Sequence, residues 1–294
     1  MATVSASGIP TSILLAISSA RGDDRAVDRA FQLAAQWNAV LTILHVIDST
    51  AHGRTGQNLF ADEILESISR EFAEHPHSKG LRMDLQVVSG DPAEQILIKS
   101  KQMKPDVIVM GVGHHDSLEK RFLGSTIHRV IRAATVPVLS VRSRAFATYE
   151  SILVLTDFSP PSQRALATAM AFNLGGAATV LHICEGKPTV MAEDKLEALK
   201  AELTVKLTDT VHKATTASST DTKMQESKFV TALEFGDPIN VIEYYVADSQ
   251  PQLVVVGTHG RTGFLRAVLG SVAENFLRIL PCDVLVVGSP DKKE

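Results

Sequence analysis

The sequence predicts an α/β protein with two tandem copies of an open, parallel β-sheet covered by helices. Three observations predict this fold class. The 294 residues are enough for two domains of ordinary size. The two halves of the chain repeat the same ordered sequence blocks. Short runs of valine, isoleucine and leucine without polar alternation are separated by longer segments of helical periodicity, which is typical of strands buried on both faces.

Five sequence blocks occur in the same order in both halves. The pairs are SILLAISSA with SILVLTDFS, LTILHVID with ATVLHICE, VVSGDPAEQI with ALEFGDPINVI, DVIVMGVG with QLVVVGTHG, and LGSTIHRVIRAATVPVLSV with LGSVAENFLRILPCDVLVV. We therefore expect a first domain, copy one, over residues 1–144 and a second, copy two, over residues 150–294, with the linker near Arg142–Glu150.

The elements of copy two can be placed from the same patterns. We expect five strands, near residues 151–156, 178–184, 229–235, 252–257 and 283–288. A helix is expected over residues 162–174, where two glycines end it. A second helix, over residues 192–213, carries a leucine stripe that we expect to face the core; it consists of Leu196, Leu199, Leu203 and Leu207.

Composition excludes several classes of protein. With 45% hydrophobic and 21% charged residues, the chain is predicted to be globular and soluble. The net charge of -4 gives no reason to expect nucleic acid or an anionic membrane as a partner. The only cysteines are Cys184 and Cys282, which excludes a disulfide framework. The first residues lack the basic segment and apolar run of a signal peptide, so we expect a cytoplasmic protein.

A glycine-rich segment of copy two predicts an anion cradle. The fourth strand runs into Gly257 and Gly260, and Gly270-Ser271 follow in a G-x2-G-x9-G-S pattern. Gly257 and Gly260 allow a tight turn and the close approach of a ligand. Gly270, Ser271 and Val272 open a helical segment, and the free N–H groups at a helix start favour a phosphate.

Further candidate ligand-binding residues follow the other strands of copy two. Asp157 closes the first strand, at the end of the sheet where ligands bind in open α/β folds. Its carboxylate can accept hydrogen bonds from both hydroxyls of a ribose; the alternative is a turn or helix-cap carboxylate. The backbone near Ile183 can read an adenine edge. His259 and Arg261 are either phosphate contacts or solvated loop residues.

The five blocks, the aspartate that closes the first strand, GDP after the third strand and PCDVLVV as the last strand resemble the universal stress protein family over nearly the whole chain, twice. The resemblance implies a Rossmann-like or flavodoxin-like domain, with five parallel strands in the order 3-2-1-4-5 and helices on both faces. It also implies ATP binding in one branch of the family. Pairing of domains through their fifth strands is implied too, as an intrachain pseudo-dimer, with a homodimer of chains as a further assembly.

Copy one departs from this pattern at two positions. Ser18 stands where copy two has Asp157, and a hydroxyl cannot accept from both ribose hydroxyls as a carboxylate can. His114 stands where copy two has Gly260, and its side chain would crowd the phosphate path. The residues that copy one retains are Gly111, Gly113, Gly124 and Ser125. Its GHHD segment resembles the family branch that does not bind ATP, so we expect copy one to be a degenerate site.

Catalytic and metal-binding signatures are absent from the sequence. There is no P-loop, no G-x-G-x-x-G after either first strand and no G-x-S-x-G elbow, so no catalytic residue is predicted. His114, His115 and Asp116 are adjacent along the chain, and neighbouring residues rarely ligate one ion together, so no metal site is predicted. His45 and His182 occupy matching strand positions, which favours a shared structural role.

Three functions remain open at this point. The first is a non-catalytic regulatory module of the stress response that binds ATP or ADP, with or without Mg²⁺, in copy two and acts on an unidentified protein partner. The second is a slow ATP hydrolase or a nucleotidyl-transfer enzyme that uses the same cradle. The third is a structural interaction module that binds no nucleotide.

Overall fold

The computed structural model describes residues 9–17, 24–48, 61–112, 125–144, 147–172, 176–186, 192–217, 228–258 and 271–288. The chain divides into two compact units, which meet along the sequence between Thr148 and Tyr149. We call them unit 1 and unit 2. The domain limits of 1–144 and 150–294 expected from the repeat stay a prediction.

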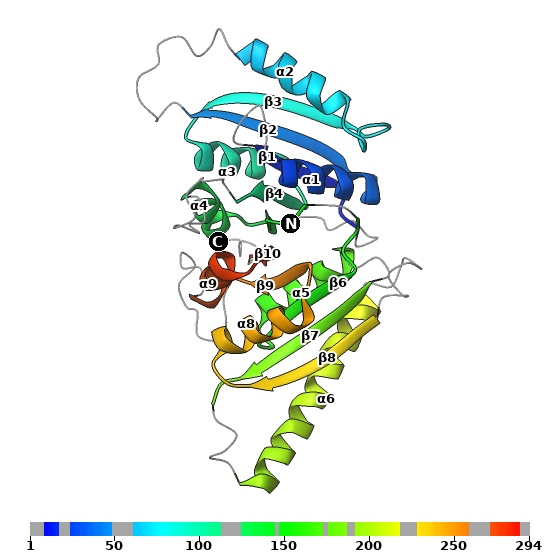
Figure 1. Ribbon diagram of the computed structural model, residues 1–294, viewed down its shortest axis with the longest axis vertical. Helices are drawn as coiled ribbons and strands as arrows, with labels where there is room; N and C mark the ends of the chain where they lie inside the picture. Colours follow the sequence, from blue (N-terminus) through cyan, green and yellow to red (C-terminus); the bar gives the residue numbers. More distant parts are fainter. Residues whose placement is uncertain are drawn as a thin grey trace. The chain divides into compact units, whose positions relative to one another are not determined.

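Unit 1 is a parallel five-stranded sheet with helical connections (Figure 1). Along the chain its elements are β1 (Ser12–Ile17), α1 (Asp24–Trp37), β2 (Val40–Asp48), α2 (Ala61–Ala73), β3 (Met83–Gly90), α3 (Pro92–Met103), β4 (Val107–Gly111), α4 (Ser125–Ala133) and β5 (Val138–Val141). The strand order is β3-β2-β1-β4-β5, which is the predicted order 3-2-1-4-5.

Unit 2 repeats this architecture. Its elements are β6 (Ser151–Thr156), α5 (Pro160–Phe172), β7 (Ala177–Cys184), α6 (Glu193–Ala217), β8 (Lys228–Phe235), α8 (Pro238–Ser249), β9 (Leu253–Gly257), α9 (Ser271–Ile279) and β10 (Asp283–Val287). All strand pairs within the unit are parallel, in the order β8-β7-β6-β9-β10. The predicted α/β class and strand order are therefore confirmed in both halves.

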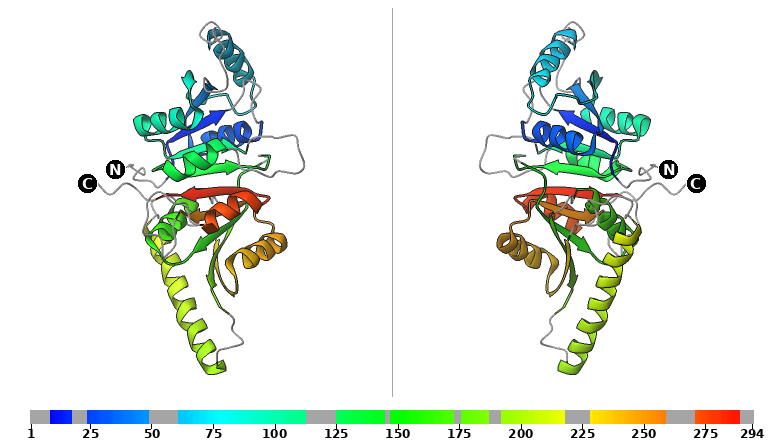
Figure 2. Two further views of the ribbon diagram at one scale, coloured as in Figure 1. Left: turned by 90° about the vertical axis from the view of Figure 1, so that its left-hand side faces the viewer. Right: turned by 90° about the vertical axis from the view of Figure 1, so that its right-hand side faces the viewer.

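Helices cover both faces of the sheet in unit 2. Helices α5 and α6 pack against each other on one face, and α8 packs beside α9 on the other (Figure 2). The central strand β9 is accordingly buried, and Leu253, Val254 and Val255 are fully buried. Sheets covered in this way need no polar alternation in their strands, which explains the apolar runs in the sequence.

A buried hydrogen bond fixes the end of the predicted linker to unit 2. The hydroxyl of Tyr149 donates to Oδ2 of Asp283 at 2.7 Å, and both side chains are almost fully buried. Tyr149 therefore belongs to the core of unit 2, although the sequence placed it in the linker.

The GDP motif sets the turn from the third strand to the following helix in each unit. Gly90 and Gly236 have φ values of 147° and 148°, a conformation that favours glycine. Asp91 and Asp237 follow as N-caps, accepting from the backbone N–H three residues on at 2.9 and 3.1 Å. The proline then occupies the first helical position, where no N–H is needed. This motif is thus explained by backbone geometry and helix capping.

The leucine stripe of α6 is buried only toward its C-terminal end. Leu207 is 1% exposed, and Val211 continues the stripe at 8%. Leu196, Leu199 and Leu203 are only half-buried. The expectation that the whole stripe faces the core was wrong for this first part, because the start of α6 runs past the edge of the sheet (Figures 1 and 2).

Candidate functional site

The ends of β6 and β9 form the topological switch point of unit 2. β6 lies between β7 and β9, and the register aligns Val154 with Val255. The helix that follows β6, α5, lies on one face of the sheet, and α9, which comes after β9, lies on the other. In open α/β sheets the crevice between such connections is where ligands bind. Asp157 and Thr258 directly follow these two strand ends, and we call this place the switch-point site.

Asp157 is tied into the turn that starts α5. Its Oδ1 accepts from the backbone N–H of Ser159 at 3.0 Å and from the Ser159 hydroxyl at 2.5 Å. The same hydroxyl lies 3.4 Å from the backbone nitrogen of Ser162, in the first turn of the helix. Asp157 is therefore a turn carboxylate in the structure, and the hydrogen bonds from Ser159 fix the position of its carboxylate.

This turn also keeps Asp157 charged. Burial of the half-buried side chain raises its pKa, but hydrogen bonds from Ser159 and Ser162 outweigh that effect and hold the pKa of Asp157 below its usual range. The switch-point site therefore presents a negative oxygen acceptor at neutral pH.

The residue after Asp157 adopts a strained conformation. Phe158 has a φ of 64°, which is uncommon for a residue with a Cβ. Its N–H donates to Oγ1 of Thr156 at 3.1 Å, and its ring packs against His182 with 4.4 Å between centroids. The ammonium of Lys206, on α6, lies 4.4 Å from the centre of the Phe158 ring. Contacts from three elements thus hold this turn in place.

The matching histidines lie at equivalent positions, beside the last residue of the first strand in each unit. Nδ1 of His182 lies 2.7 Å from the carbonyl oxygen of Thr156, its partner in the register of β6 and β7. In unit 1, His45 is the register partner of Ile17. Burial lowers the pKa of His45, and its Nδ1 is buried without a hydrogen-bond partner among the described residues. The hydrogen bond to the first strand is observed for His182 only, so the shared structural role stays a prediction.

Packing inside unit 2 leaves little room for a side chain at Gly257. A Cβ at this position would lie 3.0 Å from the carbonyl carbon of Pro161 and 3.1 Å from the backbone nitrogen of Ser162. Because both are backbone atoms at the start of α5, a larger residue would push β9 and α5 apart. From the sequence this glycine was predicted to allow the approach of a ligand, and the contact with α5 was not predicted.

The other predicted residues of copy two are described only in part. Ile183 is half-buried near the end of β7, and the backbone of Ser271 and Val272 begins α9. His259, Gly260, Arg261 and Gly270 lie outside the described residues. In copy one, Gly111 ends β4 and Ser125 begins α4; Ser18, Gly113, His114, His115, Asp116 and Gly124 lie outside the described residues.

Sequence reasoning missed the residues that position Asp157. The segment FSPPS after Asp157 contains a signal that could have been used, since serine followed by proline is typical of a helix start. No sequence signal marks Lys206, because its contact with Phe158 arises only when α6 packs onto the sheet. Within the described ranges, no group of three or more histidine, cysteine, aspartate or glutamate side chains is arranged to hold a metal ion.

Comparison with known proteins decides the family. The profile of the universal stress protein family matches residues 11–142 and 148–288. The chain belongs to the universal stress protein family. Both halves of the chain are matched, so the internal repeat is a repeat of the universal stress protein domain.

Individual universal stress proteins resemble either one half or the whole of the chain. Universal stress protein YxiE of Bacillus subtilis is 32% identical over 144 residues, covering 44% of this chain and 97% of its own. A universal stress protein of Mycolicibacterium smegmatis is 25% identical over 300 residues, covering 94% of this chain and 96% of its own. The crystal structure of a universal stress protein from Archaeoglobus fulgidus superposes with a TM-score of 0.68 at 20% identity, covering 94% of this chain and 98% of that one; this likeness shows the fold.

No helix in the described part of the chain has the length and apolarity that a membrane crossing requires.

Proposed function

We propose that unit 2 of this universal stress protein binds one ATP or ADP, with or without Mg²⁺, at the switch-point site. The chain then acts as a cytoplasmic, non-catalytic regulatory module of the stress response. Nucleotide occupancy biases its conformation or its association with a protein partner, because a ligand that binds two states with different affinity shifts the balance between them.

The observation that carries the proposal is the position of Asp157, directly after the carboxyl end of β6, where hydrogen bonds from Ser159 hold its carboxylate. A carboxylate fixed in a turn and kept ionised is a suitable acceptor for two adjacent ribose hydroxyls. The start of α9 supports the phosphate end of the same ligand, because the first N–H groups of a helix have no partner within it.

Each predicted residue has a stated role in this proposal. Asp157 accepts from the ribose, and the backbone near Ile183 reads the adenine edge. The backbone of the loop and of the helix start cradles the phosphates, with side-chain help from the loop; these residues are Gly257, His259, Gly260, Arg261, Gly270, Ser271 and Val272.

Unit 1 is proposed to bind no nucleotide, because Ser18 and His114 replace Asp157 and Gly260. The pairing of the two domains through their last strands, as a pseudo-dimer within one chain, remains a proposal that rests on the family resemblance and on the exposed edge that each isolated sheet would leave.

The test begins with the full chain purified without added nucleotide. Mass spectrometry of the released ligand and calorimetric titration of the emptied protein with ATP and with ADP are expected to give one adenine nucleotide per chain. A steady-state phosphate-release assay is expected to show at most slow turnover. Absence of binding at millimolar ATP and ADP would leave the chain as a structural module, and turnover at enzymatic rates would make it a hydrolase.

A further inference from the structure

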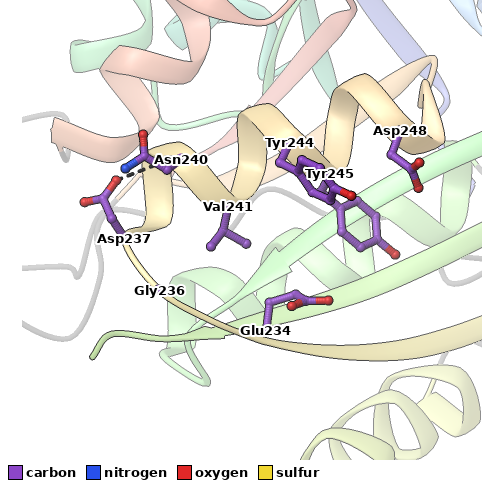
Figure 3. A pocket seen from close by; sticks show the side chains of 8 residues that line it. All are labelled: Glu234, Gly236, Asp237, Asn240, Val241, Tyr244, Tyr245 and Asp248. Atoms are coloured by element: carbon purple, nitrogen blue, oxygen red, sulfur yellow. Dashed lines mark hydrogen bonds between the residues drawn. The ribbon is translucent and has the colours of Figure 1, made fainter. Parts of the chain in front are cut away.

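A second recess of unit 2 shares no residue with the switch-point site. A groove of about 370 Å³ lies between α8 and the end of β8 (Figure 3). Its eight lining residues come from these two elements and the turn that joins them: Glu234, Gly236, Asp237, Asn240, Val241, Tyr244, Tyr245 and Asp248. A ligand in this groove would not depend on nucleotide binding at the switch-point site.

The groove combines acidic side chains with aromatic rings. Asp237 lies at one end of α8, Asp248 near the other, and Glu234 on the strand below (Figure 3). Between them lie Tyr244, which is 76% exposed, and the half-buried Tyr245. Among the described residues no lysine or arginine lines the groove, and α8 contains none. A large aromatic side chain left this exposed is available for contact with a partner.

The fold does not require this chemistry, since unit 1 has the same turn with different residues. Aligning the two N-cap aspartates places Ile98, Lys99 and Gln102 of α3 opposite Tyr244, Tyr245 and Asp248. The same alignment places Val88 opposite Glu234. Unit 1 therefore has a lysine and no acidic residue at these four positions, whereas unit 2 has two carboxylates and two tyrosines.

We propose that the α8–β8 groove binds a lysine- and arginine-bearing peptide segment of a partner protein. Cationic side chains pair with Glu234, Asp237 and Asp248 and stack on the faces of Tyr244 and Tyr245. The stretch of α8 from Asp237 to Asp248 is about 16 Å long at the rise of an α-helix. This length accommodates about five residues of an extended peptide, so the spread of charge along the groove suits a chain segment better than a single ion.

The test uses the full chain and a fluorescent eight-residue peptide with neutral ends that contains two lysines and two arginines among glycines. We expect saturable binding that weakens as salt is raised, and no binding of the same peptide with glutamate at the four cationic positions. Failure of the cationic peptide to bind at millimolar concentration overturns the proposal.

To test whether the peptide binds in this groove, three groove residues are replaced by the residues that unit 1 has at the aligned positions. The triple variant Tyr244→Ile, Tyr245→Lys, Asp248→Gln is expected to bind the cationic peptide about ten- to a hundredfold more weakly, because two cation–π contacts and one charge pair are lost and the ammonium introduced at position 245 repels the peptide. The control Tyr244→Phe, Tyr245→Phe keeps both ring faces and is expected to bind nearly as the wild type does. Circular dichroism verifies that both variants are folded.

Two other outcomes count against the proposal. Equal affinity in the wild type and the triple variant would show that the peptide binds elsewhere. If sedimentation shows that the wild type self-associates and the triple variant does not, while the peptide fails to compete, the groove receives a second copy of the chain instead.

Discussion

The two units share the same strand order and the same turn after the third strand, and they differ in particular side chains. Both turn from the third strand into the next helix through a glycine, a capping aspartate and a proline, with φ values that differ by one degree at Gly90 and Gly236. Both place a histidine beside the end of the first strand. They differ at the residue that follows the first strand, where copy two has Asp157 and copy one has Ser18. The repeated features maintain the fold, and the features found once are the candidates for function.

A difference between the units is not always functional, however. In unit 1, Oδ2 of Asp106 accepts from the backbone N–H of Thr11 at 2.7 Å and of Ser12 at 3.0 Å. At the matching place in unit 2, Oε1 of Gln252 accepts from the backbone N–H of Glu150 at 2.6 Å. Asp106 is charged and Gln252 is neutral, but in both units a side-chain oxygen accepts a backbone hydrogen bond at the start of the first strand. The divergent residues therefore have to be tested one by one.

The largest expected effect on nucleotide affinity comes from the glycine of the Gly-Ser pair that precedes α9, compared with the matching glycine before α4. Gly270→Val should abolish nucleotide binding and leave the fold intact, because a branched side chain at the start of α9 blocks the phosphates. Gly124→Val, the matched change in copy one, should leave the affinity unchanged. Calorimetry on the folded variants measures both effects. Unchanged affinity in the Gly270 variant would place the ligand away from the cradle.

The next effect concerns Asp157. Loss of a charged hydrogen-bond acceptor costs about 1.5 to 3 kcal/mol, so Asp157→Ala should weaken nucleotide binding about ten- to a hundredfold. Saturation of the wild type should reach one equivalent per chain, because copy one has Ser18 at this position. Equilibrium dialysis with ATP gives both quantities. A plateau at two equivalents would mean that the divergence of copy one has little effect on binding.

A smaller effect compares the two N-caps. Asp237→Ala should lower the free energy of unfolding of unit 2 by about 1 kcal/mol, which is typical for the loss of a cap. Asp91→Ala should cost unit 1 more, because Asp91 also accepts from Nη1 of Arg129 at 2.7 Å. Hydrogen exchange within each unit measures the two costs separately. Equal costs would show that the ion pair with Arg129 adds nothing.

The smallest effect is a dependence on pH that only unit 2 should show at this turn. The folded-state pKa of Asp157 is lowered, so its contribution to stability is complete above about pH 4, the unfolded value for aspartate, and is lost as the pH falls through the folded pKa. The stability difference between the wild type and Asp157→Asn should therefore shrink as the pH is lowered from 5 toward 3. Ser18→Ala should show no such trend. Denaturant titrations at each pH measure the difference, and a constant difference would argue against the lowered pKa.

Much of the fold could be predicted from the sequence, because the strands of a covered parallel sheet are apolar runs and the repeat presents each of them twice. The predicted strand at 151–156 has the observed limits, and the helix expected at 162–174 is observed at Pro160–Phe172. The leucines at the start of α6 were misplaced because helical periodicity does not tell how far a helix runs past its sheet.

The candidate site was predictable only in outline. Asp157 could be placed at the carboxyl end of β6 because the strand pattern fixes where that strand ends. The reason for glycine at position 257 could not be read from the sequence, since it depends on the distance to Pro161, which is set by packing between β9 and α5. For the same reason the ring contact between Phe158 and Lys206 had no sequence signal.

The left-handed conformation of Phe158 has a consequence for the order of folding. Such a conformation costs a residue with a Cβ about 1 to 2 kcal/mol, and the contacts that offset this cost come from β6, β7 and α6 together. The turn that carries Asp157 should therefore form only after these elements have docked, on the native side of the transition state. Phe158→Leu should then accelerate unfolding and leave the refolding rate nearly unchanged, as stopped-flow kinetics can measure. A matching fall in the refolding rate would mean that this turn belongs to the folding nucleus.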